Sequence, residues 1–246
     1  MTDYYIYQNE DDIAVRTEMD LSLFDEAPQN KRPWLAWVFI KMQSRDENGW
    51  CLEHEGDLLY RLQSDVIAEL KEKLDAVNSG IRMQDGWLEL FFYLPGSKKF
   101  DNVIRGLFTN YKGYAYETGA SRDEHWQHFI NEIYPNPLME QQITSRHIIS
   151  ELEEEGDTLE SEREVEHYLF SQTRAQCDRI VKALEQQGFG FKERVESDGE
   201  FAHGAVVTKV HDVTEATLMK ETTLLFNAVN DENSIYEGWS TTLADV

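Results

Sequence analysis

Two histidines have the spacing that comes nearest to metal chemistry. His125 and His128 stand three residues apart in DEHWQHF, a segment that predicts a short helix with both imidazoles on one face. A zinc site needs three or four ligands, and neither a third ligand at a recognisable spacing nor a cysteine pair accompanies them. We therefore expect no metal and no cofactor: a solvent-facing helix explains both histidines, with Trp126 and Phe129 anchoring it on the core. A hydrolase that uses one of these histidines is the alternative.

The nucleophilic residues follow no catalytic pattern. The chain has no Gly-x-Ser-x-Gly elbow and no phosphate-binding loop. Cys51 and Cys177 lie far apart, each in an apolar segment, which favours two buried, inert thiols in a reducing compartment over a disulfide or a catalytic thiol. We expect no catalytic residues and hence not an enzyme.

Carboxylates form the densest cluster of one residue type. The acidic segment, residues 151–164 (ELEEEGDTLESERE), holds eight acids in fourteen residues. It suits the docking of a cation or a basic peptide, and it equally suits a solvated helix end. The same excess extends over the whole chain, with 47 Asp and Glu against 23 Lys and Arg, a net charge of −24.

This charge decides which partners the surface favours. It repels nucleic acid and anionic lipid, and the densest basic clusters are only Lys31-Arg32 and Lys98-Lys99. We expect a protein partner with a basic surface, no direct nucleic-acid binding and no membrane association. The first residues, MTDYYIYQNEDD, lack the cationic and apolar stretches of a signal peptide, and no segment approaches the roughly 18 apolar residues of a membrane span, so we expect a cytoplasmic protein.

Pro135 and Pro137 indicate a domain boundary, because each disfavours helix in the preceding residue. We expect two domains, residues 1–137 and residues 138–246. Their net charges are −10 and −14, so both domain surfaces are acidic.

The second half alternates strand and helix patterns. A helix from about Leu138 to Glu155 ends at Gly156, and Ser171 and Thr214 are the expected caps of two later helices. With strands at 163–171, 189–197, 203–213 and 235–241, the order after the first helix is β-α-β-β-α-β, that of a ferredoxin-like sandwich.

The first half repeats this order after an N-terminal hairpin built from 4–7 and 13–21. We expect a strand at 34–42, a helix from Gly56 or Asp57 through Val77 with Leu58 among its apolar positions, and a hairpin at 81–94 around Asp85-Gly86. A helix capped by Ser97 and a strand at 111–119 complete it. The predicted fold class is α+β, two tandem ferredoxin-like sandwiches.

Three features of residues 163–246 carry a family resemblance. They are the acidic stretch running into EVEHYLF, the helix followed by Gly188-Phe189, and the closing strand 236–241 with the sequence YEGWST. This half resembles the regulator of ribonuclease E activity B family, whose last strand reads similarly as Tyr-Asp-Gly-Trp-Gly-Thr. Through the segments 87–94 and 123–126, the first half resembles a bacterial domain of unknown function.

The resemblance implies a protein-binding role: the family attaches to ribonuclease E and lowers its activity, and it offers no catalytic residues. The chain departs from it in the additional N-terminal domain and in Ser240, which stands where glycine is common; either departure allows another target. The expected binding residues are Glu151, Glu153, Glu154, Glu155, Tyr236, Glu237 and Trp239. For Trp239 a structural role in the core is favoured, and Glu237 stays open. The alternative function is an immunity or antitoxin protein that neutralises a basic nuclease.

Overall fold

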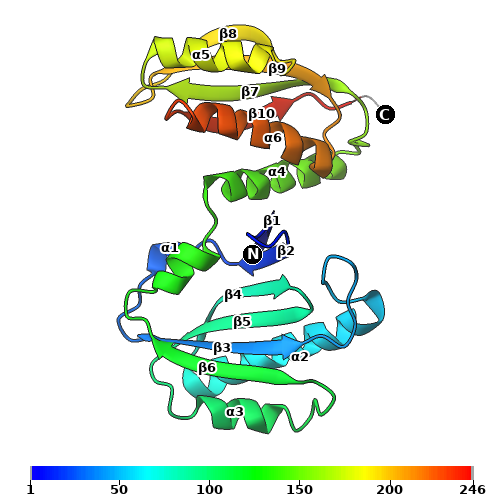
Figure 1. The fold of residues 1–246 in the computed structure, drawn as a ribbon, viewed down its shortest axis with the longest axis vertical. Coiled ribbons are helices and arrows are strands. Elements are labelled where there is room, and N and C mark those ends of the chain that lie inside the picture. Colours follow the sequence, from blue (N-terminus) through cyan, green and yellow to red (C-terminus); the bar gives the residue numbers. More distant parts are fainter. Residues whose placement is uncertain (1, 245–246) are drawn as a thin grey trace. The chain divides into compact units, whose positions relative to one another are not determined.

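The computed structural model describes residues 2–244, and the chain divides into two compact units, Met1–Asn136 and Pro137–Val246 (Figure 1). Both units place antiparallel strands beside helices in a two-layer α+β arrangement. Within the described residues, none of the helices combines the length and the apolar character that crossing a bilayer requires.

The first unit contains one six-stranded sheet with the strand order β1-β2-β4-β5-β3-β6. Without the β1–β2 hairpin, the order β4-β5-β3-β6 is that of a ferredoxin-like sandwich, as predicted. The elements of this unit are β1 (Asp3–Gln8), β2 (Ala14–Met19), α1 (Leu23–Glu26), β3 (Trp34–Lys41), α2 (Glu53–Leu74), β4 (Val77–Gln84), β5 (Trp87–Leu94), α3 (Phe100–Leu107), β6 (Tyr116–Arg122) and the π-helix η1 (Phe129–Ile133).

The second unit has a four-stranded sheet in the order β10-β7-β9-β8, again the ferredoxin-like arrangement, preceded by one additional helix. Its helix α6 packs against both α4 and α5, and α5 contacts the strands β7, β8 and β9. The elements are α4 (Pro137–Glu154), β7 (Arg163–Ser171), α5 (Arg174–Glu185), β8 (Gly190–Glu196), β9 (His203–His211), α6 (Glu215–Asn230) and β10 (Ile235–Thr241).

Helix α2 shows how the apolar pattern sets the core of the first unit. Leu59, Leu62, Val66 and Leu70 recur at helical spacing and are buried against the sheet. The expectation that Leu58 shares this stripe is wrong, since its side chain is 42% exposed. The helix also begins at Glu53, earlier than predicted, and ends at Leu74, after which Asp75 adopts the left-handed conformation (φ 53°) that closes it.

Three other local predictions differ from the structure. Ser97 does not cap α3: Lys99 is the N-cap, and no side chain bonds the free amides there. Ser171 is the last residue of β7, and Thr173 caps α5 through a capping box with Gln176, because the chain needs two residues to turn from strand to helix. The last strand of the first unit begins at Tyr116, since residues 108–114 form successive turns after α3.

The opposite face of the first sheet is covered by the segment that contains the paired histidines. The Trp126 indole stacks on the Tyr93 ring at 4.0 Å between centroids, and its Nε1 donates a 3.0 Å hydrogen bond to the Arg32 carbonyl. Trp126 and Phe129 are fully buried. The regular element here is the π-helix η1, which replaces the short α-helix expected around the two histidines.

The two histidines consequently occupy different environments. His125 is exposed, while His128 is half-buried with its ring centroid 4.5 Å from that of Phe91. Burial lowers the pKa of His128, which favours a neutral imidazole. Within residues 2–244, no cluster of three or more His, Cys, Asp or Glu side chains is arranged to hold a metal.

Replacing Trp126 should show how much this covering segment stabilises the first unit. We expect Trp126→Ala to lower the free energy of unfolding by about 3–5 kcal/mol, because it leaves a cavity beside Tyr93. Trp126→Phe, which retains an aromatic ring but loses the indole N–H, should lose less. Urea unfolding followed by tryptophan fluorescence reports on this unit, which holds five of the six tryptophans. A loss below about 0.5 kcal/mol for Trp126→Ala would contradict this role.

Candidate functional site

The acidic segment of the second unit begins on the last turn of α4. Glu151, Glu153 and Glu154 lie on the exposed side of this helix, and Glu155 follows its end. Beyond the turn at Gly156, Glu160 and Glu162 are also exposed. These six side chains are called the free carboxylates below. Among residues 137–244, none of them lies within ion-pairing distance of a basic side chain.

Helix α4 is held to the rest of its unit by contacts along its length. The Trp239 indole N–H donates a 2.9 Å hydrogen bond to the Ser145 hydroxyl, and Arg146 forms a 2.6 Å ion pair with Glu215 at the start of α6. Ile149 is buried beside Trp239 in a small apolar cluster. The glutamates at the end of α4 are therefore presented on an anchored helix.

A buried ion pair holds the loop that continues the acidic segment. The Asp157 carboxylate accepts hydrogen bonds from both terminal nitrogens of Arg163, from the Leu159 amide at 2.7 Å and from the Ala244 amide at 3.0 Å. The Arg163 hydrogen bonds hold the pKa of Asp157 far below its usual range. The Val213 amide, in turn, donates to the Leu159 carbonyl. Residues 157–163 therefore form a fixed loop that joins α4 to β7.

The charge of the segment is compensated where β7 begins. Lys192 on β8 forms ion pairs with Glu164 at 3.7 Å and with Glu166. The Lys192 hydrogen bond lowers the pKa of Glu166. The uncompensated charge of the segment is therefore carried by the six free carboxylates, from Glu151 to Glu162.

The end of α4 is an electrostatically unfavourable place for carboxylates. The aligned peptide dipoles leave a partial negative charge at the C-terminus of a helix, and the last turn of α4 carries no basic residue. Glu153, Glu154 and Glu155 thus add like charge to a negative pole and to one another. A cationic group bound at this position would relieve both repulsions.

The structure places the three predicted residues of β10 in two environments. Tyr236 and Trp239 are buried, with 7% and 6% of their surface exposed, and both side chains take part in packing the core. A register shift between Tyr236 and Gly238 allows both to point inward, and it leaves Glu237 exposed on the edge strand. Of these three residues, only Glu237 has an exposed side chain.

Sequence reasoning missed two buried groups of this unit, His167 and Asp157. His167 is fully buried in β7, where its Nδ1 lies 2.9 Å from the Tyr236 hydroxyl and its ring lies 5.8 Å from that of His211. Burial, followed by the positive charges possible on His211 and Lys209, lowers the pKa of His167 to about 3. The alternating pattern of β7 could have placed this histidine inside. No sequence pattern marks Asp157 as buried, because it is one of eight acids in the same segment.

Neither cysteine belongs to the acidic segment. Cys177 is buried in the core of the second unit and Cys51 is half-buried in the first. Burial raises the pKa of both thiols, which disfavours the nucleophilic thiolate.

The Asp157 side chain should contribute far more to the free energy of unfolding than the exposed acids beside it. We expect Asp157→Asn to lower the free energy of unfolding of the second unit by about 3 kcal/mol, since it leaves Arg163 buried and unpaired. Glu160→Gln removes the same charge from the exposed part of the loop and should change stability by less than about 0.5 kcal/mol. Calorimetry of the full chain measures both, and equal effects would contradict the proposed difference.

His167 should make the second unit sensitive to mild acid. An unfolded imidazole binds a proton below about pH 6.5, while His167 in the folded unit stays neutral to a pKa of about 3. Stability is therefore lost as the pH falls from 6.5 towards 3, by about 2 kcal/mol at pH 5. Hydrogen exchange of the β7 amides, corrected for intrinsic rates, measures this loss. In His167→Gln the slope between pH 7 and pH 5 should be much smaller, and an unchanged slope would contradict the assignment.

Comparisons with known proteins match each unit to a different family. Residues 3–134 match the model of a family of unknown function, DUF695, and residues 142–241 match the model of the regulator of ribonuclease activity B family. Both matches agree with the resemblances drawn from the sequence. A comparison with curated proteins gave no match.

Two solved structures also align with most of the chain. One is an unknown protein from Galdieria sulphuraria, with 13% identity over 83% of this chain and 96% of that chain, and a TM-score of 0.23. The other is a putative glycine cleavage system transcriptional repressor, with 9% identity over 85% of this chain and 98% of that chain, and a TM-score of 0.24. At these TM-scores neither structure informs fold or function. The match to residues 3–134 spans more than half of the sequence, so the chain belongs to the DUF695 family of unknown function, and its second unit carries the match to the regulator of ribonuclease activity B family.

Proposed function

We propose that this protein is a non-catalytic regulator that binds ribonuclease E, or a closely related RNA-processing enzyme, and lowers its activity. The observation that carries the proposal is the set of free carboxylates, held on an anchored helix and a fixed loop within the unit that matches regulators of ribonuclease activity. The family match supports regulation of a ribonuclease. The geometry supports the mode of binding.

The free carboxylates act by occupying a cationic segment of the enzyme. A ribonuclease binds RNA through basic groups that face phosphates, and Glu151, Glu153, Glu154 and Glu155 offer several anionic groups within about one helical turn. Glu160 and Glu162 extend this charge beyond the helix end. RNA and the regulator then compete for the same positive surface, so regulator binding excludes substrate without any chemical step.

The fixed loop reduces the conformational entropy that the acidic surface loses on binding. A flexible acidic tail loses conformational entropy when it binds, whereas carboxylates on an anchored helix lose only side-chain freedom. Relief of the repulsion at the end of α4 adds to the gain on binding. Tyr236 and Trp239 contribute by keeping β10 and α4 in position and make no contact with the partner. Glu237, exposed at the edge, lies within the same unit but outside the acidic segment.

The test compares two variants that remove the same charge from the same unit. We expect the triple variant Glu153→Gln, Glu154→Gln, Glu155→Gln to bind ribonuclease E about tenfold more weakly, because each exposed ion pair contributes up to about 1 kcal/mol. The control, Glu185→Gln, Glu196→Gln, Asp198→Asn, removes three exposed charges elsewhere and should keep most of the affinity. Surface plasmon resonance measures both, and inhibition of RNA cleavage should follow the same order.

Ionic strength provides a second test of the same mechanism. Binding of the unmodified protein should weaken from low to physiological salt, and the triple variant at α4 should show a shallower dependence. Binding that is insensitive to salt, or equal losses in the two triple variants, would exclude docking through the acidic segment. Capture of a small basic nuclease in place of ribonuclease E would instead favour the immunity or antitoxin function.

A further inference from the structure

A cleft in the first unit has a chemical character opposite to that of the acidic segment. It has a volume of about 400 Å³ and is lined mostly by apolar surface. Its lining residues are Trp34, Leu74, Gly96, Ser97, Lys98 and Lys99. The lysines are exposed, and among the described residues of this unit no carboxylate lies within ion-pairing distance of either.

The cleft arises because the helix layer ends before the sheet does. Trp34 is the first residue of β3 and lies on the face of the sheet that α2 and α3 cover. Helix α2 ends at Leu74 and α3 begins only at Phe100, so neither helix covers the outer part of the Trp34 ring, which remains half-buried. The Trp34 side chain is thus partly exposed and lines a mostly apolar cleft.

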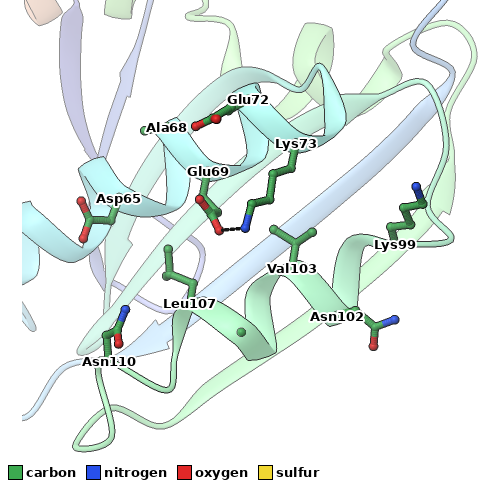
Figure 2. A pocket seen from close by; sticks show the side chains of 11 residues that line it. Asp65, Ala68, Glu69, Glu72, Lys73, Lys99, Asn102, Val103, Leu107 and Asn110 are labelled. Carbon is green, nitrogen blue, oxygen red and sulfur yellow. Dashed lines mark hydrogen bonds and ion pairs between the residues drawn. The ribbon is translucent and has the colours of Figure 1, made fainter.

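The larger groove between α2 and α3 differs in kind (Figure 2). Its volume is about 810 Å³, and its acids Asp65, Glu69 and Glu72 outnumber its bases. Lys73 bonds to Glu69 across one turn of α2, so the groove satisfies much of its own charge. Figure 2 shows Lys99 at the start of α3, and this residue lines both the groove and the cleft. The unpaired positive charge is therefore located at the cleft.

We propose that this cleft binds a small ligand with a planar aromatic ring and an anionic group, of which a nucleoside monophosphate is the representative class. The Trp34 ring and Leu74 receive the planar part, since stacking on an aromatic face tolerates any base. Lys98 and Lys99 neutralise the anionic group, and the Ser97 hydroxyl offers it a hydrogen-bond donor. A site of this volume, mostly apolar with a few polar groups at one side, has the character of a small-molecule site.

The acidity of the whole chain does not forbid an anion here. Charges separated by more than about 8 Å are largely screened at physiological ionic strength, so the nearest groups dominate the local potential. The charged residues that line the cleft are Lys98 and Lys99, and the neighbouring Asp75 carboxylate is paired with Arg32. The proposal is compatible with the predicted absence of direct nucleic-acid binding. A polynucleotide must lie along a far larger and mostly acidic surface, whereas a mononucleotide occupies only the cleft.

The experiment titrates the full chain with adenosine, uridine, guanosine and cytidine 5′-monophosphates, using calorimetry and Trp fluorescence. We expect saturable binding of at least one nucleotide, with quenching that is lost in Trp34→Leu. The Lys98→Gln, Lys99→Gln double variant should bind about tenfold more weakly. A matched control, Arg105→Gln, Lys112→Gln, removes two exposed charges of the same unit that lie outside the cleft and should bind normally.

Two further probes separate the parts of the proposal. The free nucleosides and inorganic phosphate should each bind more weakly than the complete nucleotide, because each supplies only one of the two interactions. Absence of saturable binding at millimolar nucleotide would overturn the proposal. Equal binding of inorganic phosphate, or unchanged affinity in both Trp34→Leu and the Lys98/Lys99 variant, would overturn it as well. None of these outcomes depends on ribonuclease binding by the second unit.

Discussion

The buried ion pair between Asp157 and Arg163 is the interaction on which the acidic surface depends. The pair lies at the loop between α4 and β7. The Asp157 carboxylate also accepts a hydrogen bond from the Ala244 amide, near the end of the described chain. One carboxylate thereby joins the connecting loop, the start of β7 and the segment that follows β10. The neighbouring acids differ from Asp157 only in position: they face solvent, and it faces Arg163. Of the eight acids in the segment, Asp157 thus holds the loop, Glu164 pairs with Lys192, and six form the exposed surface.

Much of the fold follows from short-range pattern. The unbroken apolar run of residues 34–42 predicts β3, the alternation in residues 163–171 predicts β7, and Asp85-Gly86, both at positive φ, makes the predicted hairpin turn between β4 and β5. The order of elements then selects the ferredoxin-like sandwich for each unit. What the pattern misses depends on residues distant in sequence. The burial of Trp126 is predicted, but its stacking on Tyr93 and its hydrogen bond to the Arg32 carbonyl join residues 33 and 94 positions apart, and local spacing does not encode them.

The candidate site also has a part that the sequence predicts and a part that depends on the tertiary fold. Exposure of the glutamates at the end of α4 follows from composition, because a helix cannot bury four acids without partners. Inward placement of Tyr236 and Trp239 depends on the register shift at Glu237, and strict alternation over residues 236–239 would have put them on opposite faces. The local errors have the same origin. Leu58 and Leu59 are equally apolar, and only the angle at which α2 meets the sheet decides which of them is buried.

The placement of charge on α4 also argues for a role beyond stability. A helix gains from basic residues in its last turn, yet α4 ends in glutamates, so its own electrostatics oppose it. The helix persists because Ser145, Arg146 and Ile149 attach it to β10 and α6 through a hydrogen bond, an ion pair and apolar packing. Tertiary contacts on one side thus maintain an unfavourable charge arrangement on the other. A fold that needed this helix only as a support could end it in lysines and be more stable; ending it in carboxylates leaves a repulsion that a basic partner would relieve.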